Sequence, residues 1–145
     1  MNRNEFIDIC NSKLKAVRSE FSLSQEIMAI MLGISKKTLV EIEKGRSSLG
    51  WSGSVVLCSL FSESQIIWES LGGNPLELIH LIAFEQSEPN YRRAMSVRVW
   101  WHTVLEEENY IIEQNIVSQH YRLLSRDGKI LASSFDIQEL KSLLK

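Results

Sequence analysis

The segment from Leu23 to Arg46, LSQEIMAIMLGISKKTLVEIEKGR, constrains the fold of this chain more than any other. Its apolar residues recur at helical spacing on both sides of a central Gly-Ile-Ser, which predicts a helix, a tight turn and a second helix. Ser24 and Ser35 are expected N-caps, because a serine hydroxyl accepts hydrogen bonds from free N–H groups in a first helical turn. Gly33 lies where the chain must reverse, and glycine adopts the positive φ needed there.

The apolar residues of the two predicted helices face each other, and Ala29 is small enough to let the helices approach closely. Polar side chains are left on the outer side. They are Gln25, Lys36, Lys37, Thr38 and Glu41. This is the layout of a helix-turn-helix.

Several short motifs in this segment follow a known pattern. They are Leu23-Ser24-Gln25, Met28-Ala29, Leu32-Gly33-Ile34-Ser35, Lys36-Lys37-Thr38, Leu39 with Ile42, and Glu43-Lys44-Gly45-Arg46. With these residue types and spacings the segment resembles the DNA-binding core of the lambda-repressor-like (Xre/Cro) family. With its flanking helices the resemblance covers residues 4–73, about half of the chain. It implies a five-helix domain that binds double-stranded DNA.

The resemblance also implies roles for individual residues. The helix from Lys36 to Lys44 would enter the major groove by its N-terminus, with Lys36 and Lys37 donating to guanine and Glu41 accepting from cytosine. Thr38 would contact a thymine methyl or a phosphate, and Gln25 a phosphate. The expected DNA-binding residues are Ser24, Gln25, Ser35, Lys36, Lys37, Thr38, Glu41, Lys44 and Arg46, of which Lys44 and Arg46 follow the DNA backbone. Each lysine considered by itself could instead be an ordinary solvated surface charge, and its position on this motif is what favours a DNA contact.

A first helix is predicted over residues 4–21, with an apolar face formed by Phe6, Cys10, Leu14, Val17 and Phe21. Arg18 lies near its end and has two interpretations, a phosphate contact or a structural ion pair. In the resembled family an arginine here commonly pairs with the glutamate of the Glu-x-Gly element, which is Glu43, so the ion pair is favoured. Loss of Arg18 would then cost stability.

The charge balance supports a nucleic-acid partner only locally. The chain carries a net charge of −2. Between Lys13 and Arg46, however, seven basic residues face four acidic ones, whereas from Pro75 onward ten acidic residues exceed eight basic ones. Since phosphate binding is driven by Lys and Arg, the local surplus supports the helix-turn-helix as the binding region.

One departure from the family pattern concerns Ile27, Ile30 and Met31, which are apolar where polar residues are usual. Either the C-terminal half covers them, or they form an exposed surface for a partner.

Two further helices complete the predicted N-terminal domain, with Ser54 and Ser64 as their N-caps. Because family members often dimerise through the last helical region, Ile66 and Trp68 are candidate interface residues. Gly72-Gly73-Asn74-Pro75 ends one helix and begins another, so we place the domain boundary between residues 73 and 74. The predicted domains are 1–73 and 74–145.

The C-terminal half is predicted to begin with an apolar helix and to continue as an antiparallel meander of three or four strands. Val97, Val99 and Trp101 alternate, and turn signals follow at Glu108-Asn109, Gln114-Asn115 and Asp127-Gly128. Asp136, with Glu139 three residues on, starts a final helix. The predicted fold class is therefore α+β, a five-helix lambda-repressor-like domain followed by a small α-β-meander-α domain.

The role of the C-terminal half is open in the sequence between dimerisation, sensing of a small-molecule effector and contact with a protein effector. Its order of elements is also that of double-stranded-RNA-binding domains. The last helix, however, lacks a basic N-terminal cluster that could bind phosphates, so RNA binding is disfavoured. A group of aromatic and histidine side chains has two interpretations, the lining of a ligand pocket or the core face of a sheet, of which the second is favoured. They are Trp100, Trp101, His102, Tyr110, His120 and Tyr121.

An enzymatic function finds no support, because the sequence has no Gly-rich phosphate loop, no GxSxG and no metal-ligand spacing. Cys10 and Cys58 are expected to be buried reduced thiols. We therefore expect no catalytic residue, metal or cofactor. No apolar run is long enough for a membrane span, and the polar N-terminus does not resemble a signal peptide, so a cytoplasmic location is expected.

The sequence thus favours a cytoplasmic, sequence-specific transcriptional regulator that binds a palindromic operator as a homodimer. The alternative is a protein-interaction module, such as an antitoxin or a phage-type anti-regulator, in which DNA binding is secondary. The acidic C-terminal half and the apolar excess of Ile27, Ile30 and Met31 motivate this alternative.

Overall fold

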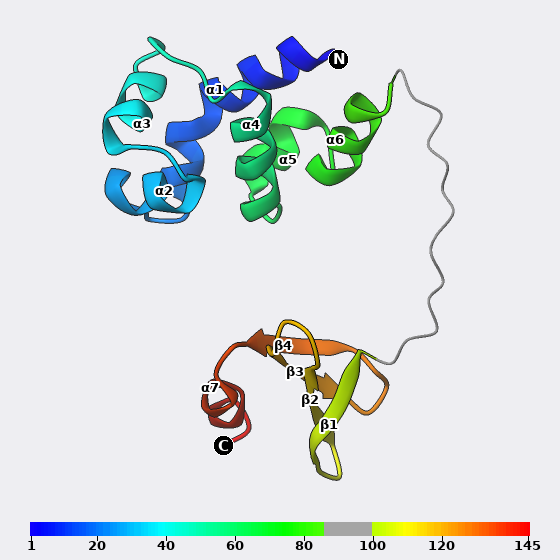
Figure 1. Cartoon of the computed structure of the whole chain (residues 1–145). Helices are drawn as coiled ribbons and strands as arrows, with labels where there is room; N and C mark the ends of the chain where they lie inside the picture. Colours follow the sequence, from blue (N-terminus) through cyan, green and yellow to red (C-terminus); the bar gives the residue numbers. More distant parts are fainter. Residues whose placement is uncertain (86–99) are drawn as a thin grey trace. The chain divides into compact units, whose positions relative to one another are not determined.

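The computed structural model describes residues 1–85 and 100–145 (Figure 1). The chain is of the mixed α+β class and divides into two compact units, Met1–Tyr91 and Arg92–Lys145. Val97 and Val99, predicted to begin the first strand, lie outside the described residues. None of the helices within the two described ranges has the length and apolar character that crossing a bilayer requires.

The described part of the N-terminal unit consists of six helices (Figure 1). They are α1 (Arg3–Glu20), α2 (Gln25–Leu32), α3 (Lys36–Glu43), α4 (Gly50–Leu60), α5 (Gln65–Leu71) and α6 (Pro75–Ala83). The first helix contacts α3, α4 and α5, and its buried residues are Phe6, Cys10, Leu14 and Val17. The predicted apolar face of the first helix is thereby confirmed, except that Phe21 is 41% exposed, with its ring 4.9 Å from that of Phe61.

The helix α6 belongs to the N-terminal core. Ile79 and Ile82 are buried in the same cluster as the residues of α1, and α6 packs against α4 and α5. The observed division of the chain therefore differs from the boundary predicted between residues 73 and 74. The reason is that Gly73, with Asn74 as N-cap and Pro75 at the first helical position, forms a turn between two packed helices and not a linker.

The predicted N-cap Ser54 is also wrong. The helix α4 begins at Gly50, and Ser54 is a fully buried residue inside it. Its hydroxyl donates to the carbonyl oxygen of Gly50 at 2.7 Å, so the helix itself satisfies this buried polar group. By contrast, Ser64 caps α5 as predicted, accepting from the N–H of Ile67.

The C-terminal unit is a four-stranded antiparallel meander in the order β1-β2-β3-β4, followed by one helix. The elements are β1 (Trp101–Glu106), β2 (Tyr110–Asn115), β3 (Tyr121–Ser125), β4 (Ile130–Ser134) and α7 (Ile137–Ser142). The predicted meander and final helix are confirmed, and the Asp136 side chain accepts from the N–H of Gln138. The turn expected at Gln114-Asn115 is wrong, because both residues belong to β2 and the turn follows at residues 116–118. Ile112, Leu123 and Leu140 form the core between one face of the sheet and α7.

Candidate nucleic-acid interface

The helices α2 and α3 are set by local interactions that the sequence encodes. Ser24 accepts from the N–H of Ile27 and Ser35 from that of Thr38, so both predicted caps are present. Gly33 adopts φ 73, which closes α2 in the left-handed conformation. Figure 1 shows the two helices side by side at the end of the N-terminal unit opposite α6.

Burial fixes which side of each helix faces outward. Met28, Ala29 and Leu32 of α2 and Leu39 and Ile42 of α3 belong to the core cluster. The first turn of α3 therefore presents its polar residues to solvent. Lys36 and Lys37 are both exposed in the described structure.

Lys36 is held by a neighbour on the other helix. Its ammonium donates to the carboxylate of Glu26 in the first turn of α2, with side-chain exposures of 53% and 58%. The hydrogen bond from Lys36 lowers the pKa of Glu26 below its ordinary value. The Lys37 side chain makes no hydrogen bond or ion pair with any described residue. Nothing in the sequence pattern places Glu26 at this site, since its approach to Lys36 depends on how the two helices cross.

A second ion pair restrains the segment after α3. Arg46 lies 3.1 Å from the carboxylate of Glu41, and both groups lie on the surface. The Lys44 side chain is exposed and forms no hydrogen bond or ion pair among residues 1–85 and 100–145. The same segment is anchored to α1 because Asn11 accepts from the N–H of Leu49 at 2.9 Å. Nothing in the sequence pattern pointed to Asn11.

Arg18 and Glu43 form the ion pair that the sequence favoured. The two nitrogens Nε and Nη2 of Arg18 donate to the two carboxylate oxygens of Glu43 at 2.6 and 3.2 Å, while Nη1 donates to the carbonyl oxygen of Leu23. The Glu43 side chain is only 5% exposed. Burial tends to raise the pKa of Glu43, but hydrogen bonds from Arg18 and Gln25 outweigh it, and the pKa is lowered.

Gln25 has a structural partner in place of the free side chain expected at a phosphate. Its Nε2 donates to Glu43 at 3.0 Å, because a buried carboxylate accepts more hydrogen bonds than Arg18 alone supplies. Thr38 is also engaged, with its hydroxyl 2.8 Å from that of Ser35. Through these contacts the side chains of Gln25 and Thr38 stabilise the helix-turn-helix segment and are not free on its surface.

The nine expected DNA-binding residues thus fall into three groups. Side chains bound within the scaffold are Ser24, Gln25, Ser35 and Thr38; those in surface ion pairs are Lys36, Glu41 and Arg46; those with no ion pair or hydrogen bond from their side chains among the described residues are Lys37 and Lys44. The described residues contain no cluster of three His, Cys, Asp or Glu side chains that could hold a metal.

Comparison of the chain with models of protein families, with curated proteins and with solved structures gave no match. The function therefore has to be argued from the residues and geometry above.

Proposed function

We propose that the N-terminal unit is a lambda-repressor-like helix-turn-helix domain and that the chain is a sequence-specific DNA-binding transcriptional regulator acting as a homodimer. One observation supports this most directly. The helix α3 is buried on one side by Leu39 and Ile42 and exposes Lys36 and Lys37 at its N-terminus on the other. A helix anchored in this way can insert its first turn into a major groove.

The proposal assigns base contacts to Lys36 and Lys37 and phosphate contacts to Lys44 and Arg46. A lysine ammonium in the major groove donates to O6 and N7 of guanine. Exposed cations in the loop after the recognition helix lie along the DNA backbone and position the helix without reading sequence. A palindromic operator would present two half-sites about one helical turn apart, ~34 Å, to the two copies.

Selection from a random duplex library, followed by binding measured across a salt series, tests the proposal. The pair Lys36→Ala with Lys37→Ala should abolish the preference for the selected sequence, since it removes the base contacts. Lys13→Ala is the matched control, because Lys13 is an exposed lysine on α1 outside the motif. Enrichment of no sequence, or an affinity that does not change with salt, would refute the proposal.

A second candidate function has its own observation. Ile27, Ile30 and Met31 are 51%, 78% and 42% exposed on α2, an unusual apolar surface for a short helix. A protein-interaction module with secondary DNA binding, such as an antitoxin, would use this surface. Co-purification with a protein partner, lost in Ile30→Glu, would favour that function. A homodimer that binds its operator equally well with Ile30→Glu would exclude it.

A further inference from the structure

The sheet of the C-terminal unit has one face that no described element of that unit covers. Ile112, Leu123 and Ala132 pack with Leu140 on the face under α7. Because side chains alternate along a strand, their neighbours point to the opposite face. This uncovered face carries more apolar surface than a solvated sheet face requires: Ile130 is 56% exposed, and Phe135, which follows β4, is 79% exposed.

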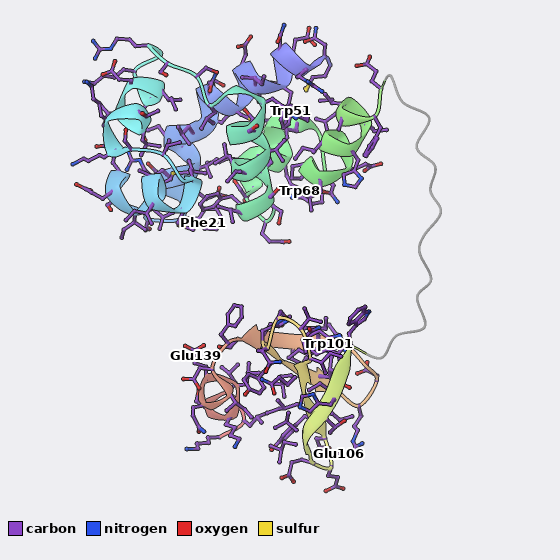
Figure 2. The ribbon with its side chains drawn as sticks, viewed as in Figure 1. Phe21, Trp51, Trp68, Trp101, Glu106 and Glu139 are labelled. Carbon is purple, nitrogen blue, oxygen red and sulfur yellow. The ribbon has the colours of Figure 1, made fainter. Side chains whose placement is uncertain are left out.

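The strand register arranges the uncovered face into three rows across the sheet. The aliphatic row is Glu106, Ile111, Leu124 and Ile130; the charged row is Thr103, Glu113, Arg122 and Ser133; the aromatic row is Trp101, Asn115, His120 and Phe135. Figure 2 shows Trp101 and Glu106 at the two ends of β1. The aromatic row, which contains Trp101, and the aliphatic row, which contains Glu106, therefore lie at opposite ends of the strands.

Contacts among the side chains confirm that the charged and aromatic rows share one face. Arg122 pairs with Glu113 at 2.7 Å and lies 3.8 Å from the ring centroid of Trp101. The His120 ring lies 5.0 Å from that of Trp101 and 6.0 Å from that of Phe135. The centre of the face is thus a neutral ion pair between a mainly aliphatic row and a mainly aromatic row.

We infer that this uncovered face is the interface with a second copy of the chain. Two identical faces meet through a two-fold axis lying between them, and an axis parallel to the strands places β1 over β4 and β2 over β3 of the second copy. Glu113 then lies over Arg122 of the second copy, and Ile111 over Leu124 of the second copy. Trp101 meets Phe135 in the same way, so that the charged pair and the aromatic residues each meet a complementary partner.

The competing occupant of an aromatic sheet face is a single-stranded nucleic acid, whose bases stack on such side chains. Charge argues against it. Residues 100–145 contain seven acidic and five basic side chains, and the face itself carries one of each in its central row. A polyphosphate would gain no counterion release from this surface, whereas a neutral, self-complementary face suits a second copy.

The size of the face indicates a reversible dimer. Four strands ~4.8 Å apart and about 18 Å long give a flat area of ~350 Å² per copy. Both copies together contribute ~700 Å² before the relief of the side chains is added, which is below the roughly 1,200–2,000 Å² that stable specific interfaces bury and in the range of weak, transient contacts. The dimer should therefore dissociate on dilution. The inference deepens the proposed function, on which it rests for the expectation of a homodimer.

Sedimentation of the full chain over a concentration series tests the interface without DNA. Phe135→Glu and Ile130→Glu should each raise the dimer dissociation constant at least ~30-fold, as expected when a charge replaces an apolar contact of an interface. Leu143→Glu is the matched control, since Leu143 is 64% exposed at the end of α7, on the other side of the sheet. This control should leave the dissociation constant unchanged.

A mixing experiment tests the two-fold geometry itself. Glu113→Arg alone places two arginines opposite each other at both symmetry-related positions, and Arg122→Glu alone places two glutamates there, so each variant should be monomeric. An equimolar mixture restores both opposite-charge contacts between copies and should dimerise. Circular dichroism of each variant checks that the sheet is intact.

Two results would overturn the inference. If the chain stays monomeric at every concentration, the face does not bind a second copy. A titration with single-stranded oligonucleotides would then show whether it binds nucleic acid. A dimer that survives both face variants but is lost in Trp68→Ala places the interface on α5. Because no DNA is used, failure of this inference leaves the DNA-binding proposal intact, and Lys36 and Lys37 variants should dimerise normally.

Discussion

The ion pair between Arg18 and Glu43 makes a quantitative prediction for stability. Both side chains are largely buried, at 16% and 5% exposed, and they share two hydrogen bonds. Arg18→Ala leaves the Glu43 carboxylate with Gln25 as its remaining side-chain donor. Removal of one partner from a buried pair costs ~3–5 kcal/mol, because an uncompensated charge stays behind. The residual donor and the partial exposure of Arg18 favour the lower end, about 3 kcal/mol.

Such a loss is large enough to measure by unfolding in urea, followed by the helical circular dichroism signal. In a domain of this size each 1 kcal/mol shifts the melting temperature by about 4–8 °C, so a fall of more than ~10 °C is expected. Lys13→Ala removes an exposed positive charge from the same helix and should change the free energy of unfolding by less than ~0.5 kcal/mol.

The pH dependence separates the ion pair from simple loss of packing. The pKa of Glu43 is lowered in the folded chain, so its contribution to stability is present above its ordinary value of 4.5 and is lost as pH falls through the folded pKa. In Arg18→Ala the hydrogen bonds from Arg18 no longer offset burial, so the pKa of Glu43 should rise. Protonation of Glu43 then removes the buried charge, and with it the cost in stability. The difference between wild type and variant should therefore shrink below about pH 4.5. A difference that stays constant from neutral to acidic pH, or one below ~1 kcal/mol at neutral pH, would refute the reasoning.

Three further predictions follow from local geometry. Gly33→Ala should cost ~1–2 kcal/mol in thermal unfolding, and Gly33→Asn less. The cost comes from φ 73 and not from a clash, because no atom beyond the two chain neighbours lies within 4 Å of an added Cβ. Glu26→Gln should leave the melting temperature unchanged and strengthen DNA binding, since it frees Lys36 and removes a carboxylate next to the expected phosphates. Cys10 and Cys58, 4% and 0% exposed with sulfurs 3.8 Å apart, should react with a thiol reagent only as fast as the N-terminal unit opens.

The features that could be predicted from the sequence are those that depend on a few neighbouring residues. The caps at Ser24, Ser35 and Ser64 each need only a hydroxyl and an N–H three residues later, and all three are present. The turn signal at Asp127-Gly128 likewise lies between β3 and β4, where Gly128 adopts φ 83. Local chemistry decides such features, so a single sequence contains the required information.

The features that could not be predicted depend on tertiary contacts. A Gly-Gly-Asn-Pro turn is equally compatible with a linker and with two packed helices, and only the burial of Ile79 and Ile82 assigns α6 to the N-terminal core. Within the candidate site, the pairing of Glu26 with Lys36 requires the crossing of α2 and α3, since ten residues separate the two in the sequence. The hydrogen bond from Gln25 to Glu43 depends on the same packing of the helices.

These internal pairs determine how strongly DNA binding should respond to salt. Each lysine or arginine that neutralises a phosphate releases a counterion, and the slope of log K against log salt is ~−0.9 per phosphate contact. If Arg46 stays with Glu41, only Lys44 neutralises a phosphate in each copy, and a dimer should show a slope of about −1.8. If Arg46 exchanges Glu41 for a phosphate, two cations contribute in each copy and the slope approaches about −3.6. Glu41→Gln removes the competitor of Arg46, so a steeper slope in this variant would show that this ion pair limits how many phosphates the wild-type surface neutralises.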